Sequence, residues 1–121
     1  MSIRQNQVAW IRGPFEASTH DITIFRGELL GQIPEGKLVI GDSGYQGEDV
    51  VAVANEFDSD DLKRFKRRAR ARQESFNGRL KVFRILLGTY RHSLEKHPIV
   101  VTALAVIVQF DMENGNPLFE V

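Results

Sequence analysis

Asp42 lies in the segment LVIGDSGYQGED (residues 38–49), where an apolar stretch runs directly into an aspartate flanked by glycines. In α/β folds, polar side chains at the carboxyl ends of strands commonly line the functional site. Gly41, Gly44 and Gly47 let the backbone turn, and they allow a phosphate or a metal to approach closely. A plain turn also favours aspartate, because its side chain hydrogen-bonds nearby backbone amides. Taken alone, the segment is compatible with both interpretations.

Glu74 is the second acid that could do chemistry, and it stands in a strongly basic segment. On a helix with about 100° per residue, it points about 180–220° away from the apolar stripe. Four cationic residues lie within about 40° of it, namely Lys63, Arg67, Arg70 and Lys81. Glu74 could also be a solvated acid that pairs with Arg70 and Lys81 and adds a little helix stability.

Together, the two acids indicate metal chemistry on a polyanion. Mg²⁺ prefers carboxylate oxygens as ligands, and a site that processes a phosphodiester also needs cations to hold the phosphates. A glutamate among arginines matches this pattern. A solvated amphipathic helix would carry the same charges, so the basic segment alone does not decide between the two interpretations.

The elements that must position these acids follow an α/β pattern. The sequence predicts strands at 7–11, 37–41 and within 48–55, with a short helix capped by Ser18 or Thr19 that ends near Gly31. A long helix is predicted at about 60–87, capped by Asp58 or Ser59, with Leu62, Phe65, Ala69, Phe76, Leu80, Phe83 and Leu87 on its apolar face. Pro98 should begin a last, wholly apolar helix that is buried and ends near Met112.

Composition limits the class of protein. At 121 residues the chain is expected to form one domain, and it contains no cysteine. Its net charge of zero hides a segregation, because residues 63–97 hold 12 of the 16 basic side chains. The apolar stretch 98–110 is shorter than the roughly 20 residues that span a bilayer. We therefore expect a soluble protein with no membrane segment and no secretory signal.

Two ordered motifs resemble a known family. GDSGYQGE and, farther along, RQESFNGRLKVFRIL are similar to the C-terminal half of the catalytic domain of DDE-type transposases of the Harbinger-like lineage. GPFEASTHDITIFRG resembles the segment that precedes them in that family, and MENGNPLFEV resembles its tails. The resemblance covers nearly the whole sequence in order.

The resemblance implies an RNase H-like fold, here partial, with a mixed sheet and flanking helices. It also implies three acids that hold two Mg²⁺ or Mn²⁺ ions for DNA cleavage and strand transfer. Asp42 would be the second acid and Glu74 the third. Candidate phosphate contacts are Arg67, Arg70, Arg72 and Lys81. The implied location is the nucleus in a eukaryote and the cytoplasm otherwise.

One departure from the family concerns its first acid, which lies upstream of the strand predicted at 7–11. The resemblance therefore predicts a single truncated domain over residues 1–121. This domain is expected to be weakly active or inactive alone, because two carboxylates provide too little negative charge for a Mg²⁺ site. The alternative is a non-catalytic DNA-binding or protein-interaction module that uses the basic helix 63–84. A third hypothesis is a fragment that exposes apolar edges. Self-association or a companion DNA-binding protein is compatible with each of these.

Overall fold

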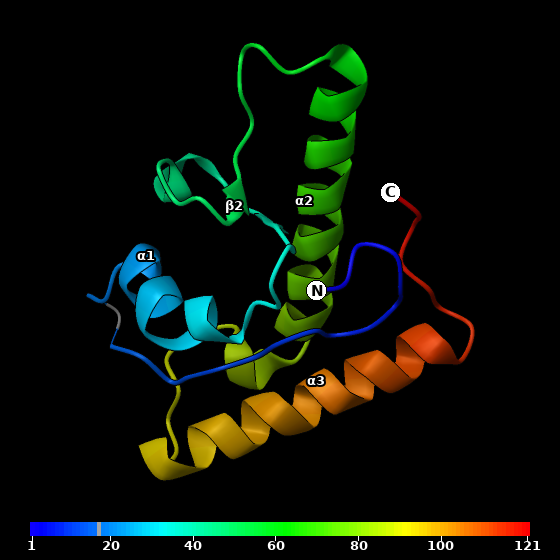
Figure 1. Cartoon of the computed structure of the whole chain (residues 1–121). Helices are drawn as coiled ribbons and strands as arrows, with labels where there is room; N and C mark the ends of the chain where they lie inside the picture. The colour runs from blue at the N-terminus through cyan, green and yellow to red at the C-terminus, as the bar shows by residue number, and fades with distance from the viewer. Residues whose placement is uncertain (17) are drawn as a thin grey trace. The chain divides into compact units, whose positions relative to one another are not determined.

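The computed structural model describes residues 1–16 and 18–121, which divide into two compact units. The central unit comprises residues 15–70, and the terminal unit combines residues 1–14 with 71–121. The division falls inside the long helix, between Arg70 and Ala71. The helices and strands follow one another along the chain (Figure 1): α1 Asp21–Ile24, the π-helix η1 Phe25–Leu29, the 3₁₀-helix η2 Leu30–Gln32, β1 Val39–Ile40, η3 Ser43–Tyr45, β2 Val51–Ala52, α2 Asp60–Lys81, η4 Arg84–Leu86, η5 Leu94–Lys96 and α3 His97–Glu113.

The central unit contains a pair of parallel strands. Val39 of β1 pairs with Val51 of β2, and Ile40 pairs with Ala52. The strands predicted within 37–41 and 48–55 are therefore confirmed, although each is two residues long. Helices and a small parallel sheet are compatible with the α/β class. Burial is less complete than predicted, because both β1 residues are only half-buried.

The helix before β1 begins later than its predicted caps. Its N-cap is His20, whose carbonyl oxygen accepts hydrogen bonds from the amides of Thr23 and Ile24 and whose side chain caps nothing. After one turn of α1 the chain widens into η1 and then tightens into η2. The helical segment ends at Gln32, one residue beyond the predicted end at Gly31.

No strand forms at residues 7–11, so that prediction is wrong. The backbone there bonds a side chain of α3 instead of a neighbouring strand. The amide of Val8 donates to Oε1 of Gln109 at 2.8 Å, and Nε2 of Gln109 donates to the carbonyl oxygen of Asn6. One amide side chain thus satisfies the polar backbone that a sheet ladder would otherwise pair.

Helix α2 starts as predicted and ends early. Oγ of Ser59 accepts from the amide of Leu62 at 3.3 Å, which is the N-cap geometry expected for serine. The helix stops at Lys81 rather than near residue 87, because Phe83 takes an extended conformation and η4 follows it. Gly78 is accommodated within the helix without a break.

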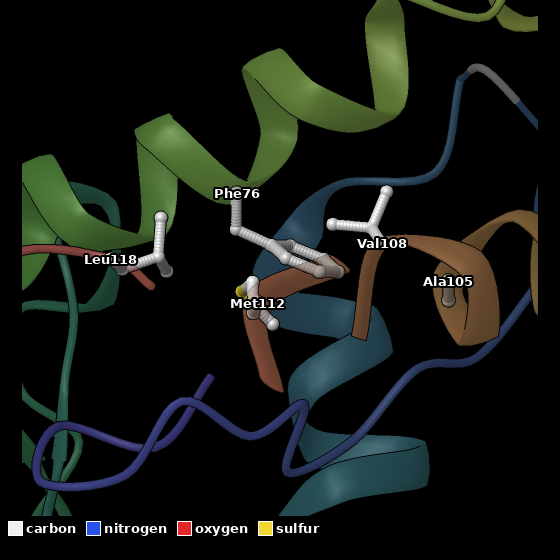
Figure 2. Close-up of a cluster of buried hydrophobic side chains, with 5 residues drawn as sticks. All are labelled: Phe76, Ala105, Val108, Met112 and Leu118. Atoms are coloured by element: carbon white, nitrogen blue, oxygen red, sulfur yellow. The ribbon is translucent and has the colours of Figure 1, made fainter. Parts of the chain in front are cut away.

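The core of the terminal unit joins α2 to α3. Figure 2 shows Phe76 of α2 directed toward Val108 and Met112 of α3, with Leu118 of the C-terminal tail and Ala105 completing the cluster. Pro98 lies in the first turn of α3 and the helix ends at Glu113, as predicted within a residue.

The prediction that the whole of α3 is buried is wrong. Its core face carries Leu104, Ala105, Val108 and Met112, whereas other apolar residues of the same helix face solvent. Within the described residues, no helix combines the length and apolarity that crossing a membrane requires.

Candidate metal centre

Asp42 occupies the position between β1 and η3, at the carboxyl end of the strand. Its Oδ1 accepts a hydrogen bond from the amide of Gly44 at 2.9 Å, so the side chain caps the short helix η3. The turn chemistry expected for this aspartate is therefore present. The side chain is nevertheless exposed, and Oδ2 has no hydrogen-bond partner among the described residues. One oxygen holds the turn while the other stays available to a ligand.

Gly41 is required by close packing rather than by turn geometry. A Cβ atom at this position would lie 2.6 Å from Cγ1 of Val51 and 3.1 Å from Cδ2 of Tyr45. Any larger residue would push β1 away from β2 or displace Tyr45. Gly47 is different, because its φ of +96° is the left-handed conformation that side chains rarely adopt. Gly41 therefore fixes the backbone directly before Asp42, whereas Gly47 is required by the turn that follows η3.

Tyr45 connects Asp42 with the first helix of the central unit. Its ring packs edge-on against Phe25 with 5.5 Å between ring centroids. Burial raises the pKa of the Tyr45 hydroxyl above its ordinary value, and the negative charges of Asp21 and Asp42 raise it further. Both carboxylates therefore act on the same phenol. The sequence patterns did not predict that Asp21 and Asp42 act on the same side chain.

Glu74 lies on α2 within the terminal unit and is exposed. In the described part of the chain its carboxylate has neither a hydrogen-bond nor an ion-pair partner, so it pairs with neither Arg70 nor Lys81. Asp42 belongs to the central unit. Across residues 1–16 and 18–121, no three His, Cys, Asp or Glu side chains cluster closely enough to hold a metal.

The four candidate phosphate contacts differ in exposure. Arg67, Arg70 and Lys81 are exposed on α2, whereas Arg72 is only 3% exposed. The Arg72 guanidinium donates to the carbonyl oxygens of Ser2 at 3.3 Å and Gln5 at 3.0 Å, to Oδ1 of Asn6 at 2.8 Å, and to the carbonyl oxygen of Phe119. Four of its five N–H groups are thus directed at the protein itself.

Comparison with known proteins decides the family. Residues 2–109 match the sequence model of a family described as DDE superfamily endonuclease. The chain belongs to the DDE superfamily of endonucleases. No curated protein and no solved structure gives a significant match. The resemblance noted in the sequence is therefore confirmed at the level of the family.

DDE superfamily endonucleases act on DNA and generally use divalent metal ions. A site of this family therefore needs side chains whose atoms can coordinate such ions. Asp42 and Glu74 both offer exposed carboxylate oxygens, which are the hard ligands that Mg²⁺ and Mn²⁺ prefer. The amide of Gly44 fixes the orientation of the Asp42 carboxylate in advance. In ligand type, these residues fit such an ion.

The burial of two cations, Lys66 and Arg72, was not predicted from the sequence. Lys66 is 8% exposed, and its ammonium donates to the carbonyl oxygen of Val53 at 2.7 Å and to Oδ2 of Asp58 at 2.8 Å. Arg72 is the other. A signal was present, since Lys66 precedes Ala69 by three residues and Arg72 precedes Phe76 by four, which places both on the apolar face.

Proposed function

We propose that this chain is a transposase-derived, metal-dependent DNA endonuclease and strand-transfer domain of partial RNase H-like fold, in which Asp42 and Glu74 are the metal ligands. The observation that carries the proposal is the placement of Asp42. Its carboxylate is exposed at the end of β1 and held by the amide of Gly44, in a chain whose family acts on DNA. The carboxyl ends of parallel strands are where α/β folds place their sites.

Each residue has a defined part in this proposal. Divalent ions in such sites supply the activation of the attacking oxygen and the neutralisation of the leaving oxygen. Asp42 and Glu74 would provide the negative charge that holds Mg²⁺ or Mn²⁺. Arg67, Arg70 and Lys81, which are exposed on α2, would contact the DNA backbone and fix its register. Arg72 is left out of this set because its guanidinium is buried and bonded to the protein.

The proposal also limits the activity. Two carboxylates neutralise less of the ionic charge than the three acids of the family pattern, so metal binding by this chain should be weak. Weak binding in turn predicts slow or absent DNA cleavage by residues 1–121 alone. Metal affinity is therefore a more direct test than cleavage.

The experiment is a Mn²⁺ titration by calorimetry on the wild type, Asp42→Asn and Glu74→Gln. Asparagine keeps an oxygen that can accept from the Gly44 amide, so Asp42→Asn removes charge while preserving the turn. Glu35→Gln changes an exposed loop acid outside the proposed site and serves as the control. We expect both site variants to lose binding and the control to retain it. Unchanged binding in either site variant would refute the ligand assignment.

A second candidate function is supported by the exposed basic face of α2. Lys63, Arg64, Arg67 and Arg70 are all exposed on the central-unit part of this helix. Such a face binds the DNA backbone without reading its sequence, and the affinity falls steeply with salt. According to this second hypothesis, the domain binds DNA but does not cleave it.

Fluorescence anisotropy with duplex DNA at several salt concentrations separates the two functions. Removing two phosphate contacts in Arg67→Ala/Arg70→Ala should reduce the magnitude of the log–log salt slope by about 1.8. The module hypothesis further requires that Asp42→Asn and Glu74→Gln leave DNA affinity in Mn²⁺ unchanged. An affinity that stays flat as salt rises would count against a phosphate-binding face.

A further inference from the structure

Helix α3 has two apolar faces, and only one of them is covered. Val108 and Met112 pack in the core of the terminal unit, where they are 4% and 2% exposed. On the other side, Ile99, Val106 and Phe110 are 69%, 62% and 66% exposed. A contiguous exposed apolar surface of this kind commonly marks an interaction site.

The exposed residues form a regular seam, which we call the α3 seam. It consists of four exposed residues, Ile99, Ala103, Val106 and Phe110, with successive spacings of four, three and four residues. At about 100° per residue these positions lie within about 60° of one another and about 180° from Val108. Alternating spacings of three and four define the contact line of a coiled coil. The seam therefore has the geometry to receive a second helix.

The order of residues along the seam is self-complementary about its midpoint. Consider a second α3 packed antiparallel on the seam, related to the first by a two-fold axis at the level of the midpoint between positions 104 and 105 along the helix. Each seam residue then faces a different seam residue of the second copy. Ile99 faces Phe110 of the second copy, and Ala103 faces Val106, so a small side chain meets a larger one. A two-fold interface requires this reciprocal pairing of one surface with itself.

The charges at the two ends of the seam agree with the same register. Lys96 precedes the seam by three residues and Glu113 follows it by three, and both are exposed. The two-fold axis that pairs Ile99 with Phe110 also pairs Lys96 with Glu113, at both ends of the interface. Glu113 accepts from Nε2 of Gln109 through Oε1, which leaves its second oxygen for the lysine. A parallel arrangement would instead bring like charges together at each end.

We propose that the α3 seam binds the α3 seam of a second copy of this chain, as an antiparallel helix pair. The seam spans 12 residues, or about 18 Å of helix. A single helix pair of this length buries less than the roughly 800 Å² per partner of a standard interface, so the dimer should be weak and dependent on concentration. The inference stands apart from the metal-ligand assignment, because no seam residue takes part in the proposed metal site.

Sedimentation equilibrium over a range of protein concentrations tests the dimer. Val106→Asp places a charge at the centre of the seam and should raise the dissociation constant at least about tenfold. Val82→Asp is the matched control, since Val82 is 78% exposed in the same unit but lies off α3. Lys96→Glu should weaken the dimer, and Lys96→Glu/Glu113→Lys should restore it. A wild type that stays monomeric at every concentration would overturn the proposal, as would a monomer that sediments with phosphatidylcholine vesicles.

Cross-linking tests the register, because the sequence contains no native cysteine to interfere. An equal mixture of the Ala103→Cys and Val106→Cys variants should oxidise mainly to the mixed disulfide-linked dimer. Each variant alone should cross-link poorly, since position 103 faces position 106 of the other copy. Efficient cross-linking of either variant with itself would instead show a parallel pair and contradict the proposed register. Circular dichroism of each variant confirms that α3 remains folded.

Discussion

At the scale of single residues, charge type alone does not reveal which cations are available to a ligand. Arg70 and Arg72 stand two residues apart in the same basic segment, yet the first is exposed and the second is 3% exposed. The difference arises because Arg72 shares the apolar face with Phe76 and turns its planar head toward backbone carbonyl oxygens. Arginine can be buried in this way, since its five donors match several fixed acceptors.

Arg72→Ala should therefore act on stability. The substitution leaves carbonyl oxygens of Ser2, Gln5 and Phe119 without their donor, and we expect the free energy of unfolding to fall by about 2–4 kcal/mol. Arg70→Ala should change it by less than about 0.5 kcal/mol, because Arg70 is exposed. Urea unfolding of both variants measures the contrast, and equal losses would contradict it.

The Asp58–Lys66 pair predicts a dependence of stability on pH. The hydrogen bond from Lys66, followed by that from the amide of Asn55, lowers the pKa of Asp58 below its ordinary value of 3.8. A lowered pKa in the folded state means that the pair stabilises the fold above that ordinary value and that this contribution disappears as pH falls below it. Asp58→Asn should be less stable than the wild type at pH 7, with a difference that shrinks below about pH 4. A difference that stays constant in urea titrations from pH 7 to pH 3 would contradict this assignment.

At the scale of elements, the sequence predicted correctly those helix starts and strands that depend on interactions between residues close together in the chain. The Ser59 cap, Pro98 at the start of α3 and the two strands beside Asp42 all follow from short-range preferences. The sequence could not show that Gln109 would replace a strand partner for residues 6–8, because the two segments are about a hundred residues apart. Nor could an apolar run reveal that only one face of α3 is covered.

Gln109→Ala tests whether one side chain holds the N-terminal segment. The substitution removes the acceptor of the Val8 amide, so that amide should exchange with solvent faster, by roughly a factor of ten for each 1.4 kcal/mol of lost protection. Thr102→Ala, on an exposed position of the same helix, is the control. Hydrogen exchange followed by NMR at Val8 gives the readout, and unchanged exchange would mean that other contacts hold the segment.

At the scale of the whole molecule, the sequence predicted the family, but not the division of the chain into two compact units. The ordered motifs lie within residues 2–109, which the family match covers. Asp42 falls in the central unit and Glu74 in the terminal unit, although α2 runs continuously through both. Helix periodicity predicts α2 as one continuous helix. It carries no information about the long-range contacts that assign the first half of α2 to the central unit and the second half to the terminal unit.

The proposed assignment of two ligands to one ion makes thermal stability in the presence of metal the most discriminating measurement. An ion that binds only the folded chain at about 100 times its dissociation constant should add about 2.7 kcal/mol to the free energy of unfolding. Because the proposed ion needs both acids, Asp42→Asn and Glu74→Gln should each abolish the Mn²⁺-dependent rise in melting temperature, whereas Glu35→Gln should keep it. Calorimetric scans with Mn²⁺ and with EDTA provide the comparison. If one site variant kept the full rise while the other lost it, the two-ligand assignment would be wrong.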